Sequence, residues 1–167
     1  MGTLEVLLVD NHLLAVVKPA SVPVVPDASG DESLLDRARA WVRREFEKPG
    51  EAFLGVVHRL DRPVSGLVLV ARTSKAAARL SQQFRDHAVR KLYLAVSEGE
   101  VRGTAGGVEQ WLLKDHDSNR VRVPPGPCEG ARLARTDWRV LAVRSHRTLL
   151  ELEPHTGRPH QLRLGPQ

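Results

Sequence analysis

Two apolar stretches open the chain, and a short polar turn separates them. Residues 4–9 and 13–18 are each long enough for a strand, and Asp10-Asn11-His12 between them is a favourable turn sequence. We therefore predict that the chain begins with a β-hairpin. Residues 19–31 are rich in Pro, Ser, Gly and Asp, and we expect them to form a loop.

Helical spacing of apolar residues follows this loop. Asp31 or Ser33 is expected to cap the first helix, and Pro49-Gly50 to end it. The apolar positions that share its buried face are Leu34, Leu35, Ala38, Trp41, Val42 and Phe46. A second helix is predicted to begin at Thr73 or Ser74. The aromatic residues of the two helices, Trp41, Phe46 and Phe84, are predicted to lie in the core.

A polar segment separates two further apolar stretches, 53–57 and 67–71, which are predicted to be buried strands. The run between them, His58-Arg59-Leu60-Asp61-Arg62-Pro63-Val64-Ser65-Gly66, places one carboxylate between two arginines. Charged side chains are seldom buried without a partner, so we expect Asp61 at a sheet edge or in a cleft. Nearby cations favour an ionised Asp, which suits a nucleophile or a base. A turn whose charges only solvate a loop explains the spacing equally well.

From Lys91 onward the chain alternates short strands with turns rich in Gly and Pro. The predicted strands are 92–97, 108–113, 120–123, 133–143 and 148–153. Because successive strands joined by turns pair antiparallel, we predict an α+β fold in which two helices pack on a mainly antiparallel or mixed sheet. A chain of 167 residues builds one ordinary core, so we predict a single domain over residues 1–167.

Charge and cysteine content narrow the class of partner and the compartment. The formal net charge is +5, which favours a polyanionic partner. The single cysteine, Cys128, excludes an internal disulfide and fits a reducing compartment. No apolar run has the length of a membrane span, and no signal sequence precedes the first strand. We expect a cytoplasmic protein, a monomer, that does not contact a membrane.

Histidines raise the question of a metal site. His58, His155 and His160 are the candidate ligands, but the chain has one cysteine and shows no compact ligand spacing. We expect no metal.

Three separated stretches, in order, resemble the RluA-type pseudouridine synthases, which isomerise uridine to pseudouridine in ribosomal and transfer RNA. Residues 58–73, HRLDRPVSGLVLVART, are similar to the catalytic motif of that family. Residues 90–96, RKLYLAV, are similar to its K-x-Y-x-A-x-V strand, and residues 150–163, LELEPHTGRPHQLR, to its L-x-P-x-T-G-R-x-H-Q-I-R segment. The opening through Lys18-Pro19-Ala20 also resembles the start of these domains.

The resemblance implies a role for each matching residue. A uridine in folded RNA must be flipped out of the stack before its C5 can react. Asp61 is the implied catalyst, Tyr93 stacks on the flipped uracil, and Arg163 pairs with the Asp61 carboxylate. The implied RNA-binding residues are Arg59, which reaches toward the vacated position, and His58, Arg62, Arg158 and His160. Isomerisation involves neither redox change nor hydrolysis, so no cofactor is expected.

The sequence departs from the family pattern at three places. Val64 replaces a common Thr, Pro159 fixes the backbone before His160, and the family domain continues past H-Q-I-R into a helix and a G-D-x-x-Y-G stretch that is absent here. The domain is therefore expected to be C-terminally shortened.

Two other functions compete with the uridine isomerase. An inactive RNA-binding remnant would keep the basic residues without chemistry. A glycosidase would pair Asp61 with Glu151 or Glu153 as a protonated acid.

Overall fold

The chain folds into two compact units, Met1–Ala88 and Val89–Gln167. The computed structural model describes residues 3–47, 49–115 and 120–164. We describe each unit by itself, and the single domain over residues 1–167 stays a prediction.

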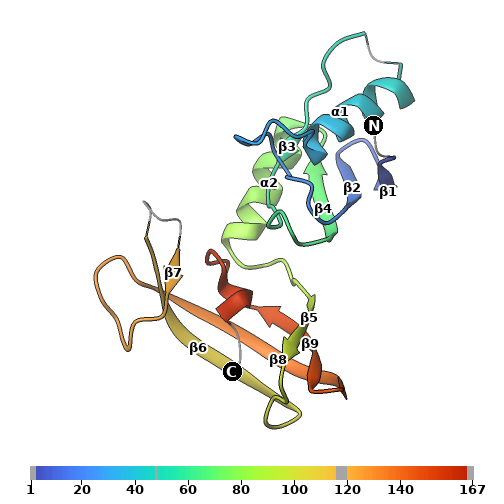
Figure 1. Ribbon diagram of the computed structural model, residues 1–167. Coiled ribbons are helices and arrows are strands. Elements are labelled where there is room, and N and C mark those ends of the chain that lie inside the picture. The colour runs from blue at the N-terminus through green and yellow to red at the C-terminus, as the bar shows by residue number, and fades with distance from the viewer. Residues whose placement is uncertain (1–2, 48, 116–119, 165–167) are drawn as a thin grey trace. The chain divides into compact units, whose positions relative to one another are not determined.

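The first unit is a four-stranded antiparallel sheet with two helices (Figure 1). Its elements in chain order are β1 (Glu5–Val9), β2 (Leu13–Lys18), α1 (Leu34–Glu45), β3 (Gly55–Val56), β4 (Gly66–Ala71) and α2 (Ser74–Arg85). The strands lie in the order β1-β2-β4-β3. The predicted opening hairpin is confirmed, because β1 pairs antiparallel with β2. The sequence also placed β3 and β4 on either side of the Asp61 segment, and the two strands pair antiparallel, with Val56 opposite Val70.

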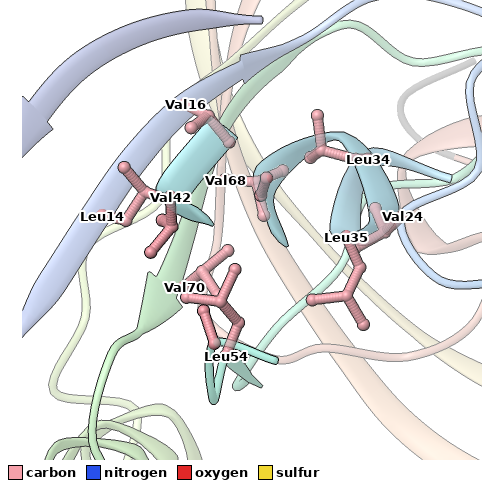
Figure 2. Close-up of a cluster of buried hydrophobic side chains, with 11 residues drawn as sticks. Leu14, Val16, Val24, Leu34, Leu35, Val42, Leu54, Val68 and Val70 are labelled. Carbon is pink, nitrogen blue, oxygen red and sulfur yellow. The ribbon is translucent and has the colours of Figure 1, made fainter. Parts of the chain in front are cut away.

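Helix α1 covers the sheet through its apolar face. Ser33 caps the helix in a reciprocal capping box with Asp36, which fixes where the helix begins. The buried side chains that form the core are Leu14, Val16, Val24, Leu34, Leu35, Ala38, Val42, Ala52, Leu54, Val68 and Val70. Figure 2 shows leucines and valines of β2 and β4 meeting those of α1. Each fully buried side chain of this kind contributes about 1.5–3 kcal/mol, so this cluster dominates the stability of the unit.

The aromatic residues predicted to be core behave differently from one another. Trp41 packs partly buried against the core. Phe46 is 40% exposed, which contradicts the prediction. It is the C-cap residue of α1, so it no longer follows the helical face, and the Arg72 guanidinium lies 4.1 Å above its ring centre. Phe84 on α2 is half-buried.

The second unit is a five-stranded antiparallel sheet (Figure 1). Its elements are β5 (Tyr93–Glu98), β6 (Ala105–Lys114), β7 (Val121–Arg122), β8 (Arg132–Arg144), β9 (Arg147–Pro154) and the 3-10 helix η1 (Gln161–Leu164). The strands lie in the order β5-β9-β8-β6-β7. Strand β6 begins three residues earlier than predicted, where Gly106 lies under the Trp138 indole. A Cβ at Gly106 would come within 2.8 Å of that ring.

The α+β class with antiparallel strands is confirmed. The strands divide between two sheets, whereas the sequence predicted one, and α1 and α2 both belong to the first unit. Within the described part of the chain, neither helix is long and apolar enough to cross a membrane.

Candidate active site

The segment that carries Asp61 is a loop, residues 57–65, between β3 and β4. Asp61 itself is exposed, and its carbonyl accepts the Val64 N–H at 3.0 Å, which closes a tight turn. Gly66 ends the loop with φ of +144°, a backbone conformation that side-chain-bearing residues rarely adopt. The predicted polar segment between two paired strands is confirmed. The first strand is shorter than the predicted 53–57, and Phe53 and Leu67 are exposed, so the two stretches are not buried throughout.

His58 fastens the start of the loop to the neighbouring elements. Its ring stacks on Phe84 of α2, with 4.7 Å between ring centres and 19° between planes. Its Nε2 accepts the backbone N–H of Leu69 at 2.8 Å. Strand β3 is only two residues long, so the imidazole supplies an acceptor where that strand has ended. These contacts give His58 a structural task, and its predicted RNA-binding role stays a prediction.

Lys18 also fastens the loop, and the resemblance included it in the opening stretch but gave it no role. The residue is fully buried, and its Nζ donates to the carbonyls of Pro19 at 2.9 Å, Val22 at 2.8 Å and Arg62 at 3.0 Å. Burial lowers the pKa of Lys18, the Arg62 charge lowers it further, and the Asp61 carboxylate raises it. The buried Lys18 ammonium therefore interacts electrostatically with Asp61 and stabilises the loop backbone at Arg62, the next residue.

The two arginines that flank Asp61 differ in their surroundings. Arg59 is exposed, and within the residues that the structure describes its side chain has no hydrogen bond or ion pair. Arg62 instead bonds the Ser21 carbonyl and the side chains of Asp27, Ser29 and Asp31. The donors of Arg62 are therefore engaged within the first unit, and the RNA-binding role of Arg59 stays a prediction.

The remaining predicted site residues lie in the second unit. Tyr93 is half-buried at the start of β5 and pairs with Leu152 of β9. The segment that contains Arg158, His160 and Arg163 follows the end of β9. The structure thus groups His58, Arg59, Asp61 and Arg62 in one unit and Tyr93, Arg158, His160 and Arg163 in the other. The contacts of Tyr93 and Arg163 with Asp61 stay predictions.

Gln161 organises the segment after β9. Its side chain is buried and makes four hydrogen bonds: Nε2 donates to the Arg135 carbonyl at 2.9 Å and to the Thr136 hydroxyl at 2.8 Å. Its Oε1 accepts the Thr156 hydroxyl at 2.8 Å and the Arg158 N–H at 2.9 Å. The resemblance placed Gln161 inside a matching motif but gave it no role. Its burial shows that it is the internal support of this segment.

Other contacts fix the ends of the same segment. Arg158 Nε donates to the Leu133 carbonyl at 3.0 Å, and Gln110 Nε2 donates to the Leu164 carbonyl at 2.6 Å. His160 has a positive φ of 54°, which turns the chain into η1, where Arg163 is exposed. Arg163 therefore starts from a helical turn that is held at both ends.

The two glutamates that a glycosidase would use are held by arginines. Arg90 forms a bidentate pair with Glu153, with both N···O distances at 2.9 Å, and Arg139 lies 2.9 Å from Glu151. The hydrogen bond from Arg90 lowers the pKa of Glu153 below its ordinary value. The general acid of a glycosidase needs a raised pKa, so Glu153 is poorly suited to be that proton donor. Among the described residues, no three His, Cys, Asp or Glu side chains gather to hold a metal ion.

Comparison with known proteins agrees with this geometry. The sequence pattern of the family described as RNA pseudouridylate synthase matches residues 12–165. The chain is 33% identical over 98% of its length to the Bacillus subtilis (strain 168) protein named "Uncharacterized RNA pseudouridine synthase YhcT", of which it covers 53%. It is 34% identical over 95% of its length to "Ribosomal large subunit pseudouridine synthase C" of Vibrio vulnificus (strain CMCP6), of which it covers 47%.

Further relatives have the same kind of name. The chain is 36% identical over 96% of its length to "tRNA pseudouridine synthase C" of Pectobacterium carotovorum subsp. carotovorum, of which it covers 44%. It is also 35% identical over 96% of its length to "Uncharacterized RNA pseudouridine synthase ZMO0505" of Zymomonas mobilis, of which it covers 70%. The chain thus spans about half the length of most of the curated relatives that it matches.

A solved structure has the same fold. "Human RNA Pseudouridylate Synthase Domain Containing 4" aligns with a TM-score of 0.81 and 26% identity, over 96% of this chain and 62% of that one. A sequence pattern that covers nearly the whole chain and a relative matched over 70% of its own length determine the family. The chain belongs to the RluA-type family of RNA pseudouridine synthases.

Proposed function

We propose that this protein isomerises uridine to pseudouridine in ribosomal or transfer RNA, with Asp61 as the catalytic residue. The observation that carries the proposal is the Asp61 loop, fixed by His58 on one side and Lys18 on the other, in a chain that matches the family pattern over residues 12–165. Relatives named as ribosomal and transfer RNA pseudouridine synthases support both substrate classes. Action on such RNAs implies a cytoplasmic enzyme, and we retain the monomer as part of the proposal.

The reaction needs one carboxylate and no cofactor. The bond between the ribose C1′ and uracil N1 breaks, the base turns, and C1′ bonds to C5. The proton on C5 leaves, and N1 gains a proton, so the product has the atoms of the substrate. An ionised Asp61 suits attack on the nucleotide or assistance in proton removal. The exposed position of Asp61 lets a flipped nucleotide reach it.

Five of the other predicted residues bind the RNA or orient the catalyst in this proposal. Arg59, whose guanidinium has no partner within the described residues, enters the space that the flipped uridine leaves. Tyr93 stacks on the uracil, and Arg163 pairs with the Asp61 carboxylate. Arg158 and His160 lie on the Gln161-supported segment and contact the RNA backbone.

The test is pseudouridine formation by the wild-type chain and by Asp61→Asn. Each protein is incubated with uridine-containing ribosomal and transfer RNA, and the nucleosides from the digested RNA are separated and quantified. Asparagine preserves the size of Asp61 and removes its charge, so the proposal expects product from the wild type and at least about a 10³-fold slower reaction from the variant. Filter binding of the same RNAs shows whether the variant still binds.

Each alternative predicts a different outcome. RNA binding by a folded wild-type protein without any pseudouridine would favour the inactive RNA-binding remnant and refute the proposal. Release of free uracil, measured in the same digests, would favour a glycosidase. Equal pseudouridine yields from the wild type and Asp61→Asn would exclude Asp61 as the catalyst.

A further inference from the structure

The guanidinium of Arg62 points into its own unit. Its Nε donates to the Ser21 carbonyl at 3.1 Å. One terminal nitrogen bonds Asp27 at 3.3 Å and the Ser29 hydroxyl at 2.9 Å, and the other bonds Asp31. An arginine side chain has five N–H groups, and Arg62 makes four hydrogen bonds within its own unit. Little donor capacity is left for a bidentate contact with a phosphate.

The main chain of Arg62 is held at the same place. Its carbonyl accepts the Ser21 N–H at 2.8 Å and the Lys18 ammonium at 3.0 Å. Ser21 and Arg62 therefore exchange two hydrogen bonds, one through the Arg62 backbone and one through its side chain. Arg62, the residue after Asp61, is thus joined to residues 18–31 through both its main chain and its side chain.

The partners of Arg62 form a small acidic turn. Asp27 accepts the backbone N–H of Ser29 at 3.0 Å and its hydroxyl at 2.5 Å, and the Asp31 N–H bonds the Ser29 hydroxyl at 3.2 Å. The hydrogen bonds from Ser29, with a smaller effect of Arg62, lower the pKa of Asp27. Two carboxylates surround this guanidinium and offset its positive charge, which makes it a poor ligand for a phosphate.

We propose that Arg62 is a positioning residue that clasps the Asp61 loop to residues 19–31, and that Asp27 and Asp31 are the other half of this clasp. The proposal rests on the proposed function of Asp61 and replaces the RNA-binding role that the sequence gave to Arg62. The clasp sets the position of the carboxylate relative to the flipped nucleotide. Misplacement of a reacting group by about 1 Å costs about 10²-fold in rate.

The test compares Arg62→Ala, Arg62→Lys and the double variant Asp27→Asn with Asp31→Asn. For each protein, kcat and KM for pseudouridine formation are measured on one RNA, together with RNA affinity as a function of salt. Glu51→Gln, which removes an exposed acid elsewhere in the first unit, is the matched control. Amide hydrogen exchange of residues 57–65 reports loop order without reference to activity.

The clasp predicts a loss in kcat. Arg62→Ala should lower kcat about 10- to 100-fold with KM and RNA affinity within about twofold. The Asp27 and Asp31 double variant should also lose kcat. A protein that carries all three changes should have the same kcat as Arg62→Ala alone, because the residues act through one set of contacts. Arg62→Lys should stay defective, because an ammonium cannot reproduce the planar fork. Loop exchange should accelerate in all of these variants and not in Glu51→Gln.

A phosphate contact predicts the reverse pattern and would overturn the clasp. Arg62→Ala would then weaken RNA binding and leave kcat unchanged. The slope of log affinity against log salt concentration would fall by about one, because one phosphate contact is lost. Arg62→Lys would keep most of the wild-type affinity. The Asp27 and Asp31 double variant would bind RNA more tightly. If the wild type forms no pseudouridine, the proposed function fails and the exchange measurement alone decides the clasp. If Arg62→Ala does not fold, the Asp27 and Asp31 double variant distinguishes the clasp from the phosphate contact.

Discussion

Leucine in place of Gln161 is expected to destabilise the second unit by about 2–4 kcal/mol. The glutamine is 5% exposed and bonds the Arg135 carbonyl, the Thr136 and Thr156 hydroxyls and the Arg158 N–H. Leucine has a similar volume and none of these donors and acceptors. The substitution therefore removes the polar partners of the segment and leaves the packing nearly unchanged.

The magnitude follows from what each partner retains. The Arg135 carbonyl keeps the His155 N–H at 3.0 Å, and the Thr156 hydroxyl still accepts the Arg135 N–H at 3.0 Å. The Arg158 N–H and the Thr136 hydroxyl are left to find new partners. A buried polar group without a partner costs about 1–3 kcal/mol, and the apolar burial of leucine offsets part of the sum for two.

Urea unfolding followed by tryptophan fluorescence measures this loss. In a Trp41→Phe background the remaining indoles, Trp111 and Trp138, both lie in the second unit. The control is Gln83→Leu, an exposed glutamine on α2, which should change stability by less than about 0.5 kcal/mol. A loss below that value for Gln161→Leu, or an equal loss for the control, would refute the supporting role of Gln161.

Two further predictions concern His58 and Glu153. Phenylalanine at position 58 keeps the stacked ring and leaves the Leu69 N–H without its acceptor, so we expect a loss of about 1–2 kcal/mol and faster amide exchange at Leu69; an unchanged Leu69 exchange rate would contradict this. The pKa of Glu153 lies below its ordinary value of 4.5, chiefly because of the hydrogen bond from Arg90. Glu153 is therefore protonated more readily in the unfolded chain than in the folded one. The stabilisation of the fold by the Arg90–Glu153 pair is present above pH 4.5 and is lost as the pH falls below it. Glu153→Gln should weaken the fall of the urea midpoint as the pH drops below 4.5, and parallel curves for both proteins would show that the ion pair does not contribute.

Local sequence signals sufficed for most elements because their causes are local. Ser33 and Thr73 cap the two helices within three residues of their partners, and the strand patterns lie within single stretches. Phe46 was predicted wrongly because apolar spacing does not show that the helical geometry ends at that residue. The division into two sheets depends on pairings between distant strands, such as β5 with β9, which no local pattern encodes.

The candidate site shows the same limit more sharply. The charge pattern around Asp61 was visible in the sequence, but Arg59 and Arg62 look alike there. Their difference depends on partners of Arg62 that lie 31 to 41 residues earlier in the chain. Lys18 likewise reads as the polar end of a strand, and only the folded structure shows that its ammonium group is buried against three carbonyls.

Lys18 also makes the Asp61 loop depend on a contact between distant parts of the chain. Its bond to the Arg62 carbonyl spans 44 residues, and Lys18 lies opposite Gly66 where β2 pairs with β4. A nascent chain emerges N-terminus first, so this bond cannot form until Arg62 has left the ribosome. Contacts between segments this far apart form more slowly than local hairpin contacts, so Lys18 holds the Asp61 loop only once β2 and β4 have met.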